Sequence, residues 1–524
     1  MKRSTVVLFA VLLASPARAV AIDGVAVIVR MTSAVSAASV HALQAAVGGF
    51  DVRARWHIIN GFAATMTREQ ARALRMRRDV AAIEQDAGAR ATASNARTSF
   101  GVAKAAADFG VTGDRDGAPR TYTRNDVVAC IVDTGVDASH VDLDGGQVLA
   151  WQDFVNGHAA PYDDNGHGSH VAGILAGQGD GNARYRGVAP GAALVVAKAL
   201  NASGGGSVAD IISAVQFCVD ARATFDVRIL SMSLGGSGSS DGRDALSDAV
   251  NAAAADGLLP VVAAGNEGPR ERSIGSPAAA ASALTVCSMA DPGVNGFSVS
   301  PFSSRGPTAD GRVKPDVCGP GASITSVRAN STDGYVTYSG TSMATPFVAG
   351  VAALMLDADP ALTPAKMKSI LIGTAQDWRT PGADQDTGAG RLQGYDAIRF
   401  AGSYSGNGPS VSPHYALGAR SIKTARAEDR WRFDVTSTSA PIALTLIVPN
   451  ASASKDFDVY LYTDEGGSLT LLSSGETTTH QDTIGFAPTA TGRFVVAVRS
   501  YAGAGTYTLD VSARAGAPVL TIDG

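Results

Sequence analysis

Short apolar segments alternate with helical patterns through residues 98–402, and this alternation limits the fold more than any other feature of the chain. Strands buried on both faces read as continuous or nearly continuous apolar runs, and five such runs occur at residues 127–132, 194–199, 227–232, 258–263 and 283–286. Between them lie helix candidates at residues 207–221 and 244–255. The pattern predicts an α/β domain with a parallel, doubly wound sheet, whose functional side chains lie at the carboxyl ends of the strands.

A smaller α/β unit precedes this domain at residues 20–97. We expect strands at residues 25–29 and 80–83, a helix at residues 36–47, and a second helix that starts at Thr67 with Gln70 completing a capping box. Residues 87–99 are small and polar without periodicity, which predicts a linker or a processing site.

The end of the chain has a different pattern. Residues 403–415 are rich in Gly, Ser and Pro and are interpreted as a flexible linker, after which apolar and polar residues alternate. Period-two segments at residues 431–435, 457–462, 494–498 and 507–511 predict an all-β sandwich or jelly roll over residues 416–517.

The first 19 residues are typical of a cleaved signal peptide. Lys2 and Arg3 precede an apolar run, and Ala17 and Ala19 supply a small-x-small cleavage pattern. The run is too short to span a bilayer, and we expect no later segment to approach that length. We therefore predict a secreted, soluble monomer that has no membrane partner.

Charge is divided unevenly along the chain. Residues 1–97 hold 13 Lys/Arg and 6 Asp/Glu, a net +7, whereas the remainder carries −12. A basic head on an acidic body favours intramolecular docking. No Lys/Arg-rich run contains interleaved aromatic residues, so nucleic acid is not expected as a partner.

The four cysteines have no metal-binding spacing. An oxidising compartment permits two disulfides, and four cysteines allow three pairings, so both the state and the pairing stay open at this point. The residues are Cys130, Cys218, Cys287 and Cys318.

Three segments carry catalytic residue types. Asp133 ends an apolar strand in the sequence Ile-Val-Asp-Thr-Gly, and His167 opens an apolar helix within Asn-Gly-His-Gly-Ser-His. Ser342 lies between a glycine and an apolar helix in Gly-Thr-Ser-Met-Ala-Thr-Pro, where Pro346 is tolerated only in a first turn. Each feature alone has a structural interpretation: a turn carboxylate, a structural histidine or an N-cap serine.

Two other interpretations were weighed for these segments. His167 and His170 are three residues apart and could share a metal, but no third ligand lies near them in the sequence. Residues 238–242 satisfy the Gly-x-Ser-x-Gly pattern of lipases and esterases, yet no strand enters this Gly/Ser-rich loop directly, so a nucleophile elbow is not expected.

Taken together, the Asp, His and Ser segments resemble the subtilase family of serine peptidases over about 300 residues, in the family's order and at its typical separations. Residues 231–236, 263–268 and 303–307 also resemble family segments. Residues 20–90 are similar to the family's inhibitory propeptide, most visibly at residues 59–62, and the β-rich end resembles the extension of some exported members.

The resemblance implies a serine endopeptidase that needs no cofactor for catalysis. Ser342 would be the nucleophile, His167 the general base and acid, and Asp133 the group that orients the imidazole. The amide of Asn266 and the N–H of Ser342 would stabilise the oxyanion. Protein and peptide substrates, and the chain's own propeptide as intramolecular inhibitor and chaperone, are the expected partners.

Substrate binding is implied by the same resemblance. Main-chain edges would pair with an extended peptide, and an open S1 pocket would favour large apolar P1 residues with broad specificity. The expected residues are Ser233, Leu234, Gly235, Ala264, Gly265, Glu267 and Gly275. Glu267 at the rim could admit a basic P1 residue, and Asp163 and Asp164 could influence P2.

Calcium is a further expectation. Asp142 matches one ligand of the family's usual calcium loop, but residues 177–187 do not reproduce the rest of that loop. In the β-rich end, Asp456, Asp458 and Asp464 flank a turn and form a second candidate site for structural calcium.

Two other functions compete with this interpretation of the whole chain. One is a surface-binding protein with a degenerate catalytic domain, and the other is a transpeptidase that uses the same acyl-enzyme.

Overall fold

The computed structural model describes residues 24–56, 60–85, 93–290, 298–409, 412–449, 451–452, 454–477 and 481–522. The chain forms two compact units, Met1–Gly88 and Ala89–Gly524. The signal peptide predicted at residues 1–19 lies outside the described residues.

The first unit is a four-stranded antiparallel sheet with two helices. The strand order is β2-β3-β1-β4, formed by Gly24–Met31 (β1), Asp51–Trp56 (β2), Gly61–Thr67 (β3) and Val80–Gln85 (β4). Helices α1 (Ala37–Val47) and α2 (Arg68–Arg75) complete the core with the sheet. The predicted capping box is present, since Thr67 Oγ1 accepts from the N–H of Gln70 and Gln70 Oε1 accepts from the N–H of Thr67.

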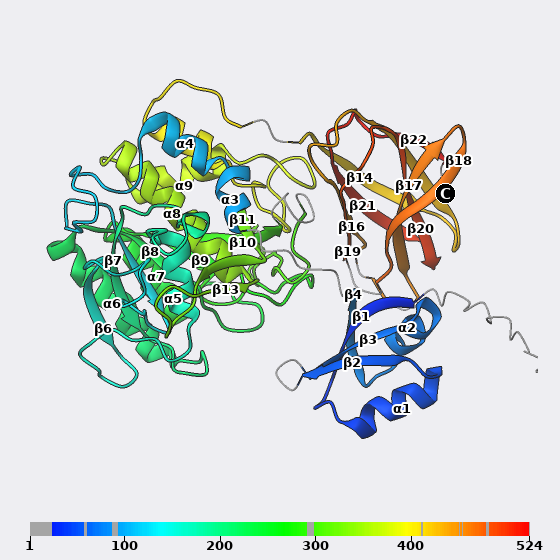
Figure 1. The fold of residues 1–524 in the computed structure, drawn as a ribbon, viewed down its shortest axis with the longest axis horizontal. Helices are drawn as coiled ribbons and strands as arrows, with labels where there is room; N and C mark the ends of the chain where they lie inside the picture. Colours follow the sequence, from blue (N-terminus) through cyan, green and yellow to red (C-terminus); the bar gives the residue numbers. More distant parts are fainter. Residues whose placement is uncertain are drawn as a thin grey trace, which may run out of the picture. The chain divides into compact units, whose positions relative to one another are not determined.

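The second unit is built on the predicted parallel sheet. Seven strands run in the order β11-β10-β9-β8-β5-β7-β6, and every neighbouring pair is parallel (Figure 1). The strands are Val128–Asp133 (β5), Val148–Asp153 (β6), Ala193–Lys198 (β7), Val227–Met232 (β8), Leu259–Ala263 (β9), Leu284–Ala290 (β10) and Val317–Ala322 (β11). The five predicted runs correspond to β5, β7, β8, β9 and β10, whereas β6 and β11 had no clear apolar signal.

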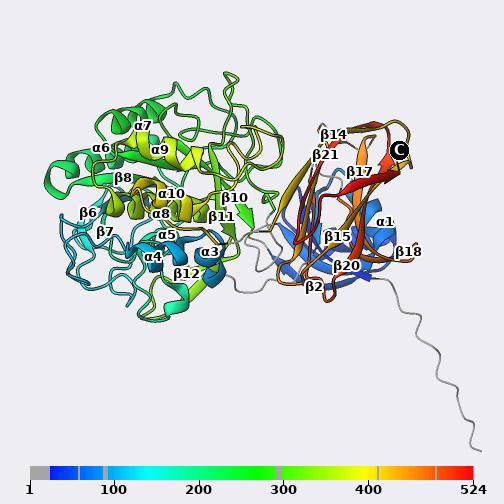
Figure 2. The ribbon, with the colours of Figure 1, turned by 90° about the horizontal axis from the view of Figure 1, so that it is seen from above.

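Helices cover both faces of this sheet and enclose two separate cores (Figure 2). Helices α6 (Val208–Phe225) and α7 (Ala245–Ala255) pack on one face, and α5 (His167–Ala176) and α8 (Thr341–Ala358) pack on the other. The remaining elements are α3 (Ala93–Ser99), α4 (Val102–Phe109), the short helix η1 (Ala183–Tyr185), the hairpin β12 (Ile324–Val327) and β13 (Tyr335–Tyr338), α9 (Pro364–Gly373) and α10 (Gly394–Ala401).

Helix α8 corrects one sequence-based expectation. Its 18 residues are long and apolar enough to cross a membrane by length and composition, although we expected no such segment. In the folded domain 83% of the helix is buried, because it lies between the sheet and helices α5 and α10. Its apolar surface is therefore that of a central core helix.

The β-rich end folds as two antiparallel sheets, as predicted. One has the order β14-β21-β16-β19 and the other β18-β17-β20-β15-β22. Their strands are His414–Ile422 (β14), Glu428–Val435 (β15), Ile442–Ile447 (β16), Asp456–Glu465 (β17), Ser468–Gly475 (β18), Gln481–Phe486 (β19), Gly492–Ala502 (β20), Gly505–Ser512 (β21) and Val519–Ile522 (β22). Strand β22 lies beyond the predicted end of the domain at residue 517, and it pairs with β15.

The junction between the two units differs from the predicted linker. Residues 93–99 form helix α3, and Ala96 and Phe100 are buried in the core of the second unit. Arg391 donates a hydrogen bond to the carbonyl of Ser99. The predicted boundary at residue 97/98 therefore falls inside a packed helix, because small residues such as alanine suit a helix as well as a linker.

Both disulfides permitted by the sequence are formed. Cys130 on β5 is bonded to Cys218 on α6, and Cys287 on β10 is bonded to its register neighbour Cys318 on β11. The pairing could not be chosen from the sequence, since it depends on which strands become neighbours.

We expect the two disulfides to stabilise the fold unequally. The Cys130–Cys218 bond closes a sequence separation of 88 residues and the Cys287–Cys318 bond one of 31. Chain entropy predicts that replacing the first pair by alanine lowers the free energy of unfolding by about 1 kcal/mol more than replacing the second. Denaturant unfolding of both double variants, in a Ser342→Ala background to prevent autolysis, measures the difference. A larger loss for the 287/318 pair would contradict this account.

Candidate active site

A groove of about 1310 Å³ crosses the carboxyl ends of the central strands. His167, Asn266 and Ser342 all line it, although they come from segments far apart in the sequence. Strands β5, β8 and β9 end beside it, which is the position expected for a site in a parallel α/β sheet.

Asp133 and His167 form a close pair at this groove. Asp133 is fully buried as the last residue of β5, and its Oδ1 lies 2.7 Å from Nδ1 of His167, the first residue of α5. Burial alone would lower the pKa of His167, but the charge and hydrogen bond of Asp133 outweigh it, so the pKa is raised above its ordinary value. The pair leaves the second ring nitrogen of His167 free to exchange a proton in the groove.

A buried carboxylate that we had assigned to substrate recognition holds this pair in place. Asp163 is 2% exposed and accepts hydrogen bonds from Thr134 Oγ1, the N–H of Gly166, and both the N–H and hydroxyl of Ser169, at 2.7–2.9 Å. These bonds outweigh the effect of burial and lower the pKa of Asp163. The predicted role of Asp163 at P2 is therefore wrong, since the carboxylate is enclosed and used by the protein itself.

Glycine is required at position 168, where helix α5 meets the turn that follows Asp133. A Cβ on Gly168 would lie 2.2 Å from the carbonyl oxygen of Gly135, which no side chain could tolerate. The backbones of the Asp133 turn and of helix α5 approach this closely because the N–H of Gly168 donates to Thr134 Oγ1 at 2.8 Å.

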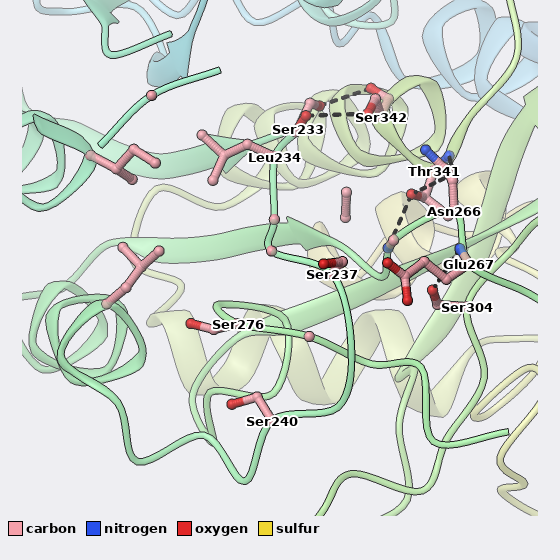
Figure 3. Close-up of a pocket in the computed structure, with 18 of the residues that line it drawn as sticks. Ser233, Leu234, Ser237, Ser240, Asn266, Glu267, Ser276, Ser304, Thr341 and Ser342 are labelled. Carbon is pink, nitrogen blue, oxygen red and sulfur yellow. Dashed lines mark hydrogen bonds between the residues drawn. The ribbon is translucent and has the colours of Figure 1, made fainter. Parts of the chain in front are cut away.

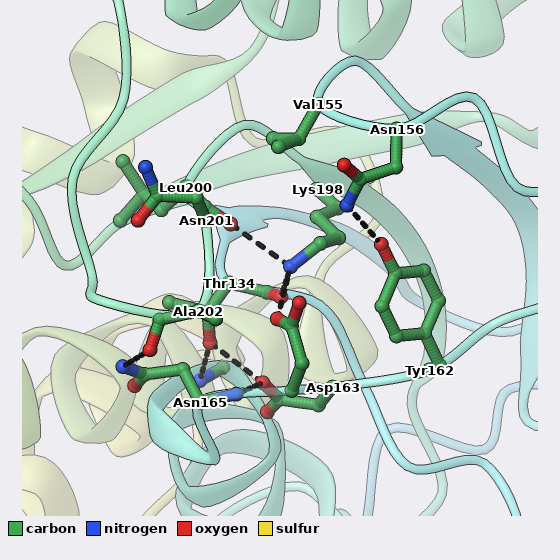
Figure 4. Close-up of polar contacts among 12 residues, drawn as sticks. Thr134, Val155, Asn156, Tyr162, Asp163, Asn165, Lys198, Leu200, Asn201 and Ala202 are labelled. Carbon is green, nitrogen blue, oxygen red and sulfur yellow. Dashed lines mark hydrogen bonds and ion pairs between the residues drawn. The ribbon is translucent and has the colours of Figure 1, made fainter.

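Asp164 is also engaged by the protein. It forms an ion pair at 2.6 Å with Lys198, a fully buried residue whose ammonium also donates to the carbonyls of Thr134 and Leu200 at 2.6 and 3.0 Å (Figure 4). Nearby, the side-chain amide of Asn165 donates to the carbonyl of Ala202 at 3.0 Å (Figure 4). These bonds tie the Asp133 turn and the His167 loop to residues 200–202.

Ser342 is the second residue of α8, and its backbone explains an unexpected proline. Pro346 lies inside the helix rather than in its first turn as predicted. A proline has no N–H to donate to the carbonyl four residues earlier, which is that of Ser342. Ser233 Oγ donates to this carbonyl at 2.8 Å instead, while Ser342 Oγ donates to the carbonyl of Ser233 at 3.1 Å (Figure 3).

The Ser342 hydroxyl thus contacts Ser233 rather than His167. Hydrogen bonds between a nucleophile and its base are often loose in the absence of substrate and tighten when substrate binds. The hydroxyl and the imidazole line the same groove.

Asn266 is oriented by its own carbonyl oxygen. Oδ1 accepts from the N–H and the hydroxyl of Thr341 at 2.9 and 3.1 Å (Figure 3). Since the oxygen of the amide is used in this way, its NH₂ group is the end available to the groove. Together with the N–H of Ser342 near the start of α8, this arrangement can stabilise negative charge beside Ser342.

Six of the seven residues expected to bind substrate line the groove: Ser233, Leu234, Gly235, Gly265, Glu267 and Gly275. Ala264 does not. It is buried, and its N–H donates to the carbonyl of Val286 in the neighbouring strand.

Two of these glycines serve close contacts rather than open space. A Cβ on Gly275 would lie 2.1 Å from the carbonyl oxygen of Gly236, and one on Gly265 would lie 2.8 Å from Ser304 Oγ. Glu267 also differs from expectation, because Oε2 accepts from Arg270 and from the N–H of Gly238, both at 3.0 Å. Its charge is thus already partly compensated.

The opposite wall of the groove was missed by sequence reasoning. Leu200, Ser203 and residues 204–206 line it, following directly after strand β7. The signal available was the Gly-Gly-Gly run at residues 204–206, placed after an apolar strand at the edge where parallel sheets hold their ligands.

The alternative interpretations of the motifs lose support. His170 is buried with Nε2 3.1 Å from the carbonyl of Val336, and burial together with nearby His167 lowers its pKa to about 3. A shared metal with His167 is therefore not indicated. Residues 238–242 lie in the loop between β8 and α7 and not in a strand–turn–helix elbow.

The carboxylates expected to bind calcium do not form the expected sites. Each carboxylate oxygen of Asp142 accepts a hydrogen bond, one from the N–H of Gly181 at 3.0 Å and the other from Tyr335 Oη at 2.9 Å. Asp456 and Asp464 are eight residues apart on strand β17, or about 26 Å at the rise of an extended strand. Asp464 accepts from the N–H of Gly467 and pairs with Arg432, so it cannot share an ion with Asp456 and Asp458.

Comparison with known proteins agrees with this geometry. The sequence model described as the Subtilase family matches residues 124–395, and that described as Peptidase inhibitor I9 matches residues 48–91. The chain is 38% identical over 304 residues to serine protease AprX of Bacillus subtilis (strain 168), covering 53% of this chain and 67% of that protein. It is 38% identical over 256 residues to subtilisin DY of Bacillus licheniformis, covering 48% and 85%. Among solved structures, Sphericase is 32% identical with a TM-score of 0.46, covering 57% of this chain and 98% of that one.

The raised pKa of His167 predicts the pH dependence of activity. A general base must be neutral, and the neutral fraction grows as pH rises through the pKa of the folded protein. Since Asp133 raises that pKa above the ordinary value, kcat/KM should rise with a midpoint above about pH 6.5 and stay high in alkaline solution. A pH profile on a peptide substrate checks this, and a midpoint well below pH 6 would contradict it.

Proposed function

This chain belongs to the subtilase family of serine peptidases, and on that premise we propose that it is an endopeptidase that hydrolyses protein substrates through an acyl-enzyme on Ser342. The observation that carries the proposal is the Asp133–His167 pair, 2.7 Å between oxygen and nitrogen, at one groove with Ser342 and Asn266.

The roles follow from the positions of these groups. His167 removes the hydroxyl proton of Ser342 as the oxygen attacks the scissile carbonyl, and it then returns that proton to the leaving amine. Asp133 fixes the imidazole through Nδ1 and stabilises its protonated form. Water then attacks the acyl-enzyme ester on Ser342, with His167 again accepting and returning the proton, and the second product is released.

Charge on the tetrahedral intermediate is met by two donors. The NH₂ of Asn266 and the N–H of Ser342 at the start of α8 lie on the groove, and the Thr341 contacts keep the amide from rotating. Fixed donors of this kind stabilise the transition state without the cost of reorienting solvent. Catalysis in this family needs no cofactor.

The two walls of the groove suit an extended peptide. Residues 233–235 and 204–206 supply main-chain groups on opposite sides, so a substrate strand would pair with backbone rather than with specific side chains. We propose broad specificity. We further propose a preference for large apolar P1 residues, because Glu267, the acidic group at the pocket, is already bonded to Arg270.

The chain is proposed to mature from a secreted precursor. The match of residues 48–91 to a peptidase inhibitor, and the folded unit before residue 88, support an intramolecular inhibitor that is released by self-cleavage. A parallel sheet has many contacts between distant residues and folds slowly, which a folded template can assist. Export rests on the signal-peptide pattern of residues 1–19.

Ser342→Ala should abolish both hydrolysis and maturation. Without the nucleophile, the variant keeps its fold but cannot form the acyl-enzyme, so full-length precursor should accumulate after expression. Casein hydrolysis and the intact mass of the purified protein measure the two effects. A variant that is processed normally in a protease-free host would exclude self-cleavage, and one that still hydrolyses casein would exclude the proposed nucleophile.

Asn266→Ala should lower kcat with little change in KM. Loss of one oxyanion donor typically reduces kcat by about 10²–10³-fold, since the donor acts on charge that is present only in the transition state. Steady-state kinetics on a peptide nitroanilide measure it. As a control, Asn251→Ala removes an amide from helix α7 at a position outside the groove lining and should leave kcat within a few-fold of wild type. Equal losses in the two variants would contradict the assignment.

A further inference from the structure

The β-sandwich contacts the catalytic domain at a segment that ends beside Ser304, one of the residues that line the groove. Gln481, the first residue of β19, is 2% exposed and reaches across the domain boundary. Its Nε2 donates to the carbonyl of Val299 at 2.7 Å, and its Oε1 accepts from Arg305 Nη2 at 2.6 Å. One side chain of the sandwich thus binds both ends of the segment from Val299 to Arg305.

Arg305 is a buried charge that needs these partners. Its side chain is 1% exposed, and its guanidinium also donates to the carbonyl of Asp386 at 3.0 Å. Nη2 also donates to the carbonyl of Ser300 at 3.4 Å, so Gln481 accepts the shorter of its two bonds. Because a weakly bonded buried charge is costly, the loss of the Gln481 acceptor should shift the arginine.

The backbone of the same segment is bonded to the groove. Arg305 donates its N–H to Ser273 Oγ and accepts from the N–H of Ser273, both at 2.9 Å. The preceding residue, Ser304, donates its N–H to the carbonyl of Gly265 at 2.9 Å, and its Oγ accepts from the N–H of Glu267 at 3.1 Å. Ser304 therefore holds both neighbours of Asn266, and Figure 3 shows its side chain beside Glu267.

We propose that Gln481 is a positioning residue for peptide hydrolysis: through Arg305 and Ser304 it fixes the loop after strand β9 that carries the oxyanion donor Asn266 and part of the wall of the S1 pocket. The inference rests on the proposed function of the groove. It assigns the β-sandwich a part in catalysis, although none of the three segments with catalytic residue types lies in it.

A second contact between the same two domains serves as an internal control. Arg379, 3% exposed, donates to Thr508 Oγ1 and pairs with Asp510, and His414 stacks on Trp378 with ring centres 3.8 Å apart. Thr508 and Asp510 lie on β21, in the same sheet as Gln481. Thr508 contacts Arg379, whose guanidinium lies 3.4 Å from a carboxylate oxygen of Asp386, the residue whose carbonyl accepts from Arg305. Thr508 is thus separated from Ser304 by three intervening residues where Gln481 is separated by one, so its removal should loosen the docking with little effect on the groove.

The experiment compares Gln481→Ala with Thr508→Val in the matured enzyme that retains the β-sandwich. Kinetics on peptide nitroanilides that differ at P1 give kcat and KM, and thermal unfolding of the same variants in a Ser342→Ala background gives Tm. Both variants should lower Tm. Only Gln481→Ala should lower kcat, by roughly 3- to 30-fold, the range for a mutation that acts through a packed network.

A double-mutant cycle identifies the route of the effect. If Gln481 acts through the oxyanion donor, Gln481→Ala should lower kcat much less in an Asn266→Ala background than in the wild type. Equal losses in both backgrounds, an unchanged kcat in Gln481→Ala, or an equal fall of kcat in Thr508→Val would each overturn the proposal. Failure of the proposed function is a separate result, since the wild-type enzyme itself would then not hydrolyse the peptides.

Discussion

The active-site geometry depends on one buried carboxylate, that of Asp163. Asp133 and His167 are 34 residues apart and belong to different elements, so a 2.7 Å contact between them requires the strand end and the helix start to be fixed against each other. Asp163 does this by accepting from Thr134 on one side and from Gly166 and Ser169 on the other. Charge-assisted hydrogen bonds are about twice as strong as neutral ones, which suits a joint that must hold within a fraction of an ångström.

Ser342, the proposed nucleophile, is held in place by a different set of hydrogen bonds. Pro346 takes one hydrogen bond out of helix α8, and the carbonyl of Ser342 that is freed accepts from Ser233 instead. An interior proline is normally unfavourable in a helix. Here it opens a position at which the first turn of the helix bonds to Ser233, directly after strand β8, so the proposed nucleophile Ser342 is attached to the wall of the groove.

Much of this could be predicted from the sequence. Buried parallel strands have a strong apolar signal, and β5, β7, β8, β9 and β10 were found by it. The Asp133, His167 and Ser342 segments were singled out by their motifs. The sequence did not reveal the features that depend on contacts between residues far apart in the chain. Asp163 looks like any acidic residue near a histidine, and nothing local says that five donors surround it. The partners of Cys130 and Cys287 depend on sheet order in the same way, and the helix over residues 93–99 forms because Ala96 and Phe100 find a core.

The linker before the β-sandwich is a second example, because its composition does not predict the contacts between the two domains. Residues 403–415 are rich in Gly, Ser and Pro, and from this composition we inferred a flexible linker. Docking is decided elsewhere, by Gln481 and by the Asp510 and Thr508 contacts of Arg379, which lie far beyond the linker in the sequence. Acidic residues were misjudged for a related reason. Asp142, Asp163 and Asp464 accept hydrogen bonds from backbone N–H groups of their own domains. These carboxylates therefore stabilise the local backbone, whereas we had expected Asp142 and Asp464 to bind calcium and Asp163 to contact substrate.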